Sequence, residues 1–123
     1  MSDEPTQDWS VDESHADKNR FKKYGKNHAR EVASCFANLA TVVEHLKAGE
    51  ALGSFRLNFF RRESGDIWRI GQTGVPSARE TRLYLLILVL PKTIYVLTIG
   101  DKDTQQADLA KCRQLESAIH SSR

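Results

Sequence analysis

The chain has 123 residues, of which 40% are hydrophobic and 28% charged, and its formal net charge is only +2. This length fits one domain and this composition is ordinary for a globular protein, so two domains and a wholly disordered chain are excluded. The longest apolar run, residues 83–90, is far shorter than the roughly 20 residues of a spanning helix, so we expect no membrane association.

The N-terminal residues differ in charge from those that follow. Residues 1–17 contain six acidic residues and no Lys or Arg, whereas residues 18–30 contain six basic residues and no acid. We interpret 1–17 as an acidic, mobile tail that contributes at most a short edge strand at 9–11, and 18–123 as the single domain. The acidic start has no apolar run, so we expect no secretory signal, a cytoplasmic location and two free thiols, Cys35 and Cys112.

Two helices are expected first along the domain, at about 16–24 and 27–48. Apolar residues in the second recur every 3.6 positions, and Gly49 stands where this helix should end. The two form either a helical hairpin or one kinked helix. The apolar residues then recur at every second position, at Phe55, Leu57 and Phe59, and this alternation predicts a strand.

A turn at 64–66 and a second strand at 67–70 complete a predicted hairpin. Residues 71–79 are a loop rich in Gly and Pro, 81–90 read as a central strand, and 93–99 as another strand. Residues 105–119 indicate a closing helix, with Asp103 or Thr104 as its N-cap. The fold class is therefore α+β: a small, mainly antiparallel sheet of about four strands, with N-terminal helices packed on it and a C-terminal helix.

Arginine dominates the strand region, and its planar guanidinium suits phosphate. Arg56 and Asn58 share one face of the first predicted strand, Arg82 and Tyr84 share a face at the start of the central strand, and Arg69 lies between them. If these faces coincide, the surface would bind phosphates by charge and stack a base on Tyr84. The alternative is that these arginines merely solvate an exposed face.

Lys102 comes directly after the last strand and before the closing helix, a position that favours anion binding. The alternative is a capping sequence with a solvated lysine. The four histidines are scattered, and no Cys or His pair has the spacing of metal ligands, so we expect no metal and no cofactor.

From about residue 21 to 115 the chain resembles the RelE/ParE toxin superfamily, and most of all its RelE/HigB-type members. The resemblance rests on four stretches in the same order, which are residues 21–23, 53–57, 81–84 and 94–103 with Asp108 and Leu109 beyond. It implies a RelE-like fold and a toxin of a type II toxin–antitoxin system that cuts mRNA on the ribosome without a metal. The implied partners are the ribosome, mRNA and a cognate antitoxin protein.

By position, the resemblance assigns Arg56 and Arg82 to stabilising charge on the phosphorus, and Lys102 to phosphate binding or proton donation. Tyr84 is a stacking or general-base candidate. Further nucleic-acid contacts are expected from four residues of the hairpin, which are Asn58, Arg61, Arg62 and Arg69.

The chain also departs from the family. Asn58 stands where some members carry a basic residue, and residues 105–108 lack the Tyr that some members have early in the final helix. A non-catalytic protein on the same fold, either a gyrase inhibitor or a degenerate toxin, therefore remains an alternative, as does a non-toxic RNA- or protein-binding domain. The acidic tail adds the hypothesis that it covers a basic face and weakens RNA binding.

Overall fold

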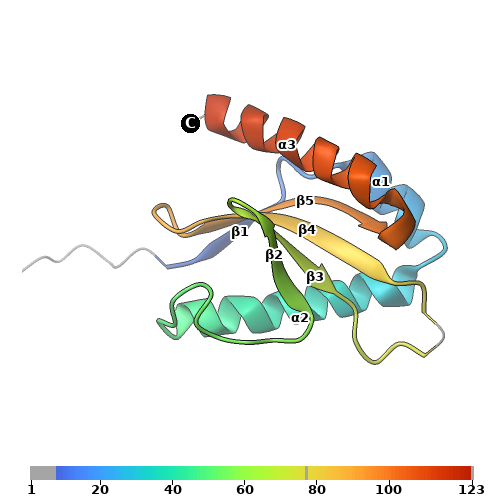
Figure 1. Ribbon diagram of the computed structural model, residues 1–123, viewed down its shortest axis with the longest axis horizontal. Coiled ribbons are helices and arrows are strands. Elements are labelled where there is room, and N and C mark those ends of the chain that lie inside the picture. The colour runs from blue at the N-terminus through green and yellow to red at the C-terminus, as the bar shows by residue number, and fades with distance from the viewer. Residues whose placement is uncertain (1–7, 77, 123) are drawn as a thin grey trace, which may run out of the picture.

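The computed structural model describes residues 8–76 and 78–122. A five-stranded sheet forms the middle layer, with one long helix on each face (Figure 1). The strands are β1 (Ser10–Asp12), β2 (Phe60–Ser64), β3 (Ile67–Gly71), β4 (Thr81–Leu88) and β5 (Thr93–Asp101). The helices are α1 (Lys18–Gly25), α2 (Ala29–Lys47), the short 3-10 turn η1 (Lys102–Thr104) and α3 (Gln105–Ser121).

The sheet is mixed, with strand order β1-β5-β4-β3-β2. Four strands pair antiparallel, as expected, but β1 runs parallel to β5 through pairs such as Val11 with Ile94. The α+β class is confirmed, and the expected sheet of about four strands is corrected to five. None of the helices among the described residues is long and apolar enough to cross a membrane.

The N-terminal segment takes part in the fold from residue 9 onward. Trp9 is buried in the core, Ser10–Asp12 is the edge strand β1, and the Asp17 side chain accepts a hydrogen bond from the backbone N–H of Arg20 and caps α1. The predicted short edge strand at 9–11 is confirmed to within one residue, whereas the expectation of a mobile tail does not hold for residues 9–17. Residues 1–7 lie outside the described part of the chain, and the hypothesis of an acidic cover stays a prediction.

One expected strand is displaced. The alternation at 55–59 predicted a strand there, but β2 begins only at Phe60. Phe55 instead stacks between His45 of α2 and Phe60, with ring centroids 4.7 and 5.9 Å apart. Segment 50–59 thus packs its apolar residues against α2 as an irregular loop. Gly49, which follows α2 with φ +90°, adopts the left-handed conformation that ends the helix as predicted.

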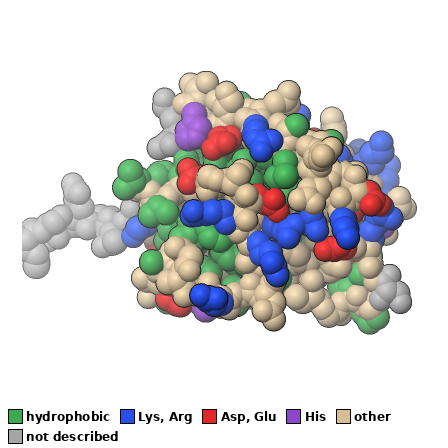
Figure 2. Space-filling model, viewed as in Figure 1, with side chains coloured by type: hydrophobic (Ala, Val, Ile, Leu, Met, Phe, Trp, Pro, Cys, Tyr) green, Lys and Arg blue, Asp and Glu red, His purple; other side chains and the backbone are tan. Residues whose placement is uncertain are grey.

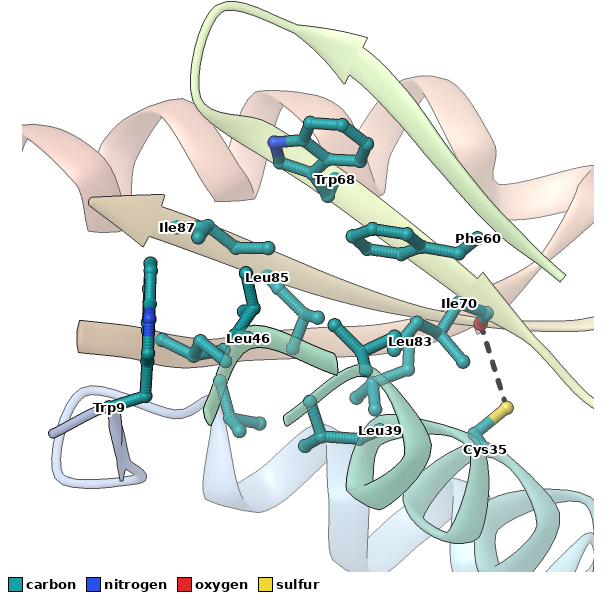
Figure 3. Close-up of a cluster of buried hydrophobic side chains, with 13 residues drawn as sticks. Trp9, Cys35, Leu39, Leu46, Phe60, Trp68, Ile70, Leu83, Leu85 and Ile87 are labelled. Carbon is teal, nitrogen blue, oxygen red and sulfur yellow. Dashed lines mark hydrogen bonds between the residues drawn. The ribbon is translucent and has the colours of Figure 1, made fainter. Parts of the chain in front are cut away.

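Two hydrophobic clusters hold the three layers together. The first lies between the sheet and α2, where Leu83, Leu85 and Ile87 of β4 meet Leu39 and Leu46 (Figure 3). The second lies between the sheet and α3, and includes Leu86, Leu97, Cys112 and Ile119. Both faces of β4 are covered, which explains why every residue from Thr81 to Leu88 is buried.

Helix α1 covers the remaining edge of β5. Strand β1 pairs with only the first residues of β5, and beyond it the Asp17 N–H donates to the Leu97 carbonyl at 2.8 Å. Farther along, the hydroxyls of Tyr24 and Thr81 share a buried hydrogen bond of 2.7 Å. These contacts fix α1 beside the end of the sheet where β4 starts.

Candidate nucleic-acid interface

The face of the sheet under α3 carries the basic side chains. Pairing sets Arg61 opposite Arg69 and Arg69 opposite Tyr84, so these three lie in one row across β2, β3 and β4. Arg82 lies on the same face of β4, two residues before Tyr84, and is paired with Gly71. Because α3 packs over β5 and β4, the half of this face formed by β2 and β3 stays open.

A pocket of about 190 Å³ occupies this open half. We call it the arginine pocket, and the polar residues that line it are Asn58, Arg61, Arg69, Gln72, Glu80, Thr81 and Arg82. Figure 2 shows Lys and Arg side chains across the middle of this side of the molecule, with Asp and Glu among them. Register therefore brings together Arg61 of β2, Arg69 of β3 and Arg82 of β4, which are up to 21 positions apart in sequence.

Two of the three arginines in the pocket already have acidic partners. The Arg69 Nε lies 3.0 Å from Glu63, and the Arg82 Nη2 lies 3.2 Å from Glu80. Arg82 also donates to the side-chain carbonyl of Gln105 at the start of α3, and its side chain is 10% exposed. Arg61 is exposed and forms no ion pair with any described residue. Arg61 is thus the open cation of the pocket, and Arg82 is a fixed one.

Tyr84 does not reach the pocket. It is fully buried under α3, and its hydroxyl has no hydrogen-bond partner among the described residues. Burial, together with the nearby Asp108 carboxylate, raises the pKa of Tyr84 to about 12. A buried ring cannot stack on a base, and a phenol with this pKa is not a base at neutral pH. The expectation for Tyr84 is therefore corrected: it is a core residue.

Three other candidate residues lie apart from the pocket. Arg62 faces the opposite side of β2, with its guanidinium 4.9 Å from the centroid of Trp68. Arg56 is exposed in the loop before β2 and is not among the residues that line the pocket. Lys102 is exposed in η1 and lines a separate hollow of about 170 Å³. Among the residues that the structure describes, Glu80 alone belongs to both the Lys102 hollow and the arginine pocket.

The turn that carries Lys102 is firmly anchored. Asp101 accepts hydrogen bonds from the backbone N–H groups of Asp103 and Thr104, and the Thr104 hydroxyl in turn accepts one from the Asp101 N–H. The Arg79 guanidinium bridges Asp101 and Asp103 at 2.5 and 2.6 Å. Burial opposes ionisation of Asp101, but the Arg79 hydrogen bond and these N–H donors outweigh it and hold its pKa below the ordinary value.

The expected N-cap of the closing helix is confirmed in position, because Thr104 is the N-cap of α3, although its side chain makes no capping hydrogen bond there. The side chain of Asp101 caps the preceding turn η1. In the described residues, no group of three or more His, Cys, Asp or Glu side chains is arranged to hold a metal ion.

Comparisons with known protein families, curated proteins and solved structures found no match. A function for this surface therefore rests on its own residues.

Sequence reasoning did not place Gln72, Glu80 or Gln105 at the site. The Gln72 side chain donates to the Arg79 carbonyl and accepts from the Thr81 N–H, which closes the wall of the pocket beside β4. Glu80 and Gln105 hold the guanidinium of Arg82. That Glu80 stands two residues before Arg82 was visible in the sequence, but the contact of Arg82 with Gln105 depends on α3 folding back over the sheet.

Proposed function

We propose that this protein binds single-stranded RNA at the arginine pocket and acts in the cytoplasm as a ribosome-dependent mRNA endonuclease, the toxin of a toxin–antitoxin pair. The observation that supports it best is the convergence of Arg61, Arg69 and Arg82 on one open pocket beside Asn58. Guanidinium groups bind phosphate through paired N–H donors, and several of them acting together stabilise charge that develops on phosphorus.

The chemistry assigned to each residue follows from its exposure and partners. Arg61 would bind the phosphate first because it is exposed and unpaired within the described residues. Arg82, held by Gln105, would stabilise the transition state from a fixed position. Glu80 lies between the pocket and Lys102, so it is the candidate base for the 2′-hydroxyl, with Lys102 as the candidate acid.

A second candidate function is non-catalytic binding on the same fold, as in a gyrase inhibitor or a degenerate toxin. The burial of Tyr84 and the separation of Arg56 from the pocket favour it, because both residues belonged to the expected catalytic set. In either case the proposed protein partner is an antitoxin that silences this chain.

Primer extension on an mRNA in a reconstituted translation system tests the proposal. The wild-type protein should produce new 5′ ends on ribosome-bound mRNA, and Arg61→Gln should lower the cleavage rate by about tenfold or more. Arg62→Gln is the matched control, since Arg62 is the neighbouring residue on the opposite face of β2, and it should leave the rate within about twofold.

Intact mRNA with wild-type protein would overturn the nuclease proposal. A fall in DNA supercoiling by gyrase under the same conditions would then favour the second candidate. Equal loss of cleavage with Arg61→Gln and Arg62→Gln would instead mean that the arginine pocket is not the site.

A further inference from the structure

A second basic surface lies at the end of the sheet where β4 starts, outside the arginine pocket. Two adjoining hollows of about 500 and 530 Å³ run along the junction of α1 and α2, and both are lined by Asn27, His28 and Arg79. We call them together the α1–α2 groove. Figure 1 shows that α1, the start of α2 and the start of β4 lie at this end. The groove is larger than the arginine pocket and is built mostly from the basic segment 18–30.

The groove carries an excess of positive charge. Lys23, Lys26 and Arg30 line it, are exposed, and form no ion pair with any residue in 8–76 or 78–122. The two carboxylates that line it are already paired: Asp101 with Arg79, and Glu31 with His28 at 3.1 Å. Five Lys and Arg side chains therefore line the described part of the groove against two carboxylates, and one of these, Glu31, also interacts with the charge of Arg30.

The walls of the groove are fixed before any ligand binds. Tyr24 is buried and bonded to Thr81 of β4, and its ring lies 4.5 Å from that of His28, centroid to centroid. Arg79 is fastened to η1 through Asp101 and Asp103. The walls would therefore lose little conformational freedom when an anion enters, which favours affinity, and the ordering cost falls on the three exposed cationic side chains.

The groove is continuous with the arginine pocket. The hollow that holds Lys102 shares Arg79 and Asp101 with the groove, and it shares Glu80 with the pocket. Basic side chains thus occur along the whole route from Arg61 on β2, past Lys102, to Arg30 on α2. The connecting hollow is also lined by three carboxylates, which are paired with arginines: Asp101 and Asp103 with Arg79, and Glu80 with Arg82. Figure 2 shows Lys and Arg side chains across this face and at its right-hand end, where α1 lies in the same view.

The chemistry of this track suits a polyanion better than a protein. The central residues of protein interfaces are apolar or aromatic and poor in lysine, but the aromatic side chain of the groove, Tyr24, is buried and its exposed side chains are mostly cationic. A curved track of cations matches the phosphates of a flexible single strand, whose affinity comes mainly from such contacts.

We infer that the α1–α2 groove is a second phosphate-binding surface, and that one RNA strand runs from the arginine pocket over η1 into this groove. The inference rests on the proposed function for the pocket end of the track. It assigns a role to the basic segment 18–30, which the pocket itself does not use.

The test measures how salt weakens binding of a fluorescein-labelled oligouridine of about 12 nucleotides, a length within the range that single-strand-binding proteins cover. Fluorescence anisotropy gives the slope of log K against log salt for the wild type, for Lys23→Gln/Lys26→Gln/Arg30→Gln and for a control, Lys47→Gln/Lys111→Gln/Arg113→Gln. The control removes the same charge from the end of α2 and from α3. Circular dichroism checks folding, and the single groove variants replace the triple variant if it does not fold.

The triple groove variant should reduce the magnitude of the slope by about 2, since each phosphate contact of a single strand contributes about 0.7, and single variants should reduce it by about 0.7 each. The control should change it much less. Equal slopes for groove and control variants, with Arg61→Gln/Arg69→Gln still weakening the complex, would overturn the inference and leave the proposed function standing. No binding by the wild type at low salt would overturn the proposed function itself.

Discussion

Gly100 is the residue where a side chain would disturb the structure most directly. A Cβ at this position would overlap the carboxylate of Asp108 and the hydroxyl of Thr104. Asp108 is 1% exposed and is held by Thr104 and Arg20, so it has little room to move. We expect Gly100→Ala to lower the free energy of unfolding by about 1–3 kcal/mol, as overpacked cores do, in urea titrations.

Gly25→Ala is the matched control. A Cβ there meets nothing within 4 Å, and Gly25 lies in the last turn of α1. Alanine should raise the stability of the helix by up to about 1 kcal/mol. Equal losses for the two variants would contradict the packing argument at Gly100.

Glu80 is the residue that competes with RNA for Arg82. Its side chain is 61% exposed, so the ion pair with Arg82 is accessible to solvent. We expect Glu80→Gln to tighten binding of oligouridine by up to about fivefold at low salt, because an exposed pair is worth at most about 1 kcal/mol. The same variant should slow mRNA cleavage if Glu80 is the base. Weaker binding by Glu80→Gln would contradict the placement of RNA beside Arg82.

The contribution of the turn η1 to the stability of the chain should depend on pH. The folded pKa of Asp101 lies below the ordinary value of 3.8, so its contribution to stability is complete above pH 3.8 and is lost as the pH falls through the folded value. Asp101→Asn should therefore destabilise the chain at neutral pH, and the difference from wild type should shrink in acid. Urea titrations across this range provide the measurement.

Asp103→Asn is the control for this element, since the Asp103 side chain is 76% exposed and its ion pair is with Arg79 alone. It should change stability little at any pH. A wild-type advantage over Asp101→Asn that grows as the pH falls would contradict the lowered pKa of Asp101.

Some helices, strands and turns could be predicted from local sequence patterns alone. The period of α2, the turn at 64–66 and the buried run in β4 depend on local residues, and each was predicted close to its observed bounds. The alternation at 55–59 was misleading because Phe55 finds its partners in His45 and Phe60, beyond any local pattern. The parallel pairing of β1 with β5 joins residues more than 80 positions apart, which no periodicity reports.

For the candidate site, the sequence identified the arginines but not the face of the sheet on which each one lies. Arg61 and Arg62 are adjacent, and only the register of β2 on β3 decides that Arg61 joins Arg69 while Arg62 lies over Trp68. Tyr84 looked accessible because Arg82 is polar and close, but α3 covers it. The packing of α3 over the sheet is tertiary structure, and it determines which side chains of the sheet remain exposed.

At the scale of the whole molecule, the three layers close both thiols off from solvent. Cys35 belongs to α2 and Cys112 to α3, each is packed in the core between its helix and the sheet with no exposed surface, and burial raises the pKa of each thiol to about 12. We expect neither to react with an aromatic disulfide reagent at neutral pH until the chain unfolds. Rapid labelling of the native protein would contradict the layered core.

The central claim is that RNA binds over β2 and β3 on the α3 side of the sheet. The side-chain Nε–H signals of its arginines, followed by NMR as oligouridine is added, test this most directly. We predict shifts for Arg61, Arg69 and Arg82 and an unchanged signal for Arg62, which lies on the opposite face. A shift of Arg62 with the other three unchanged would contradict the claim.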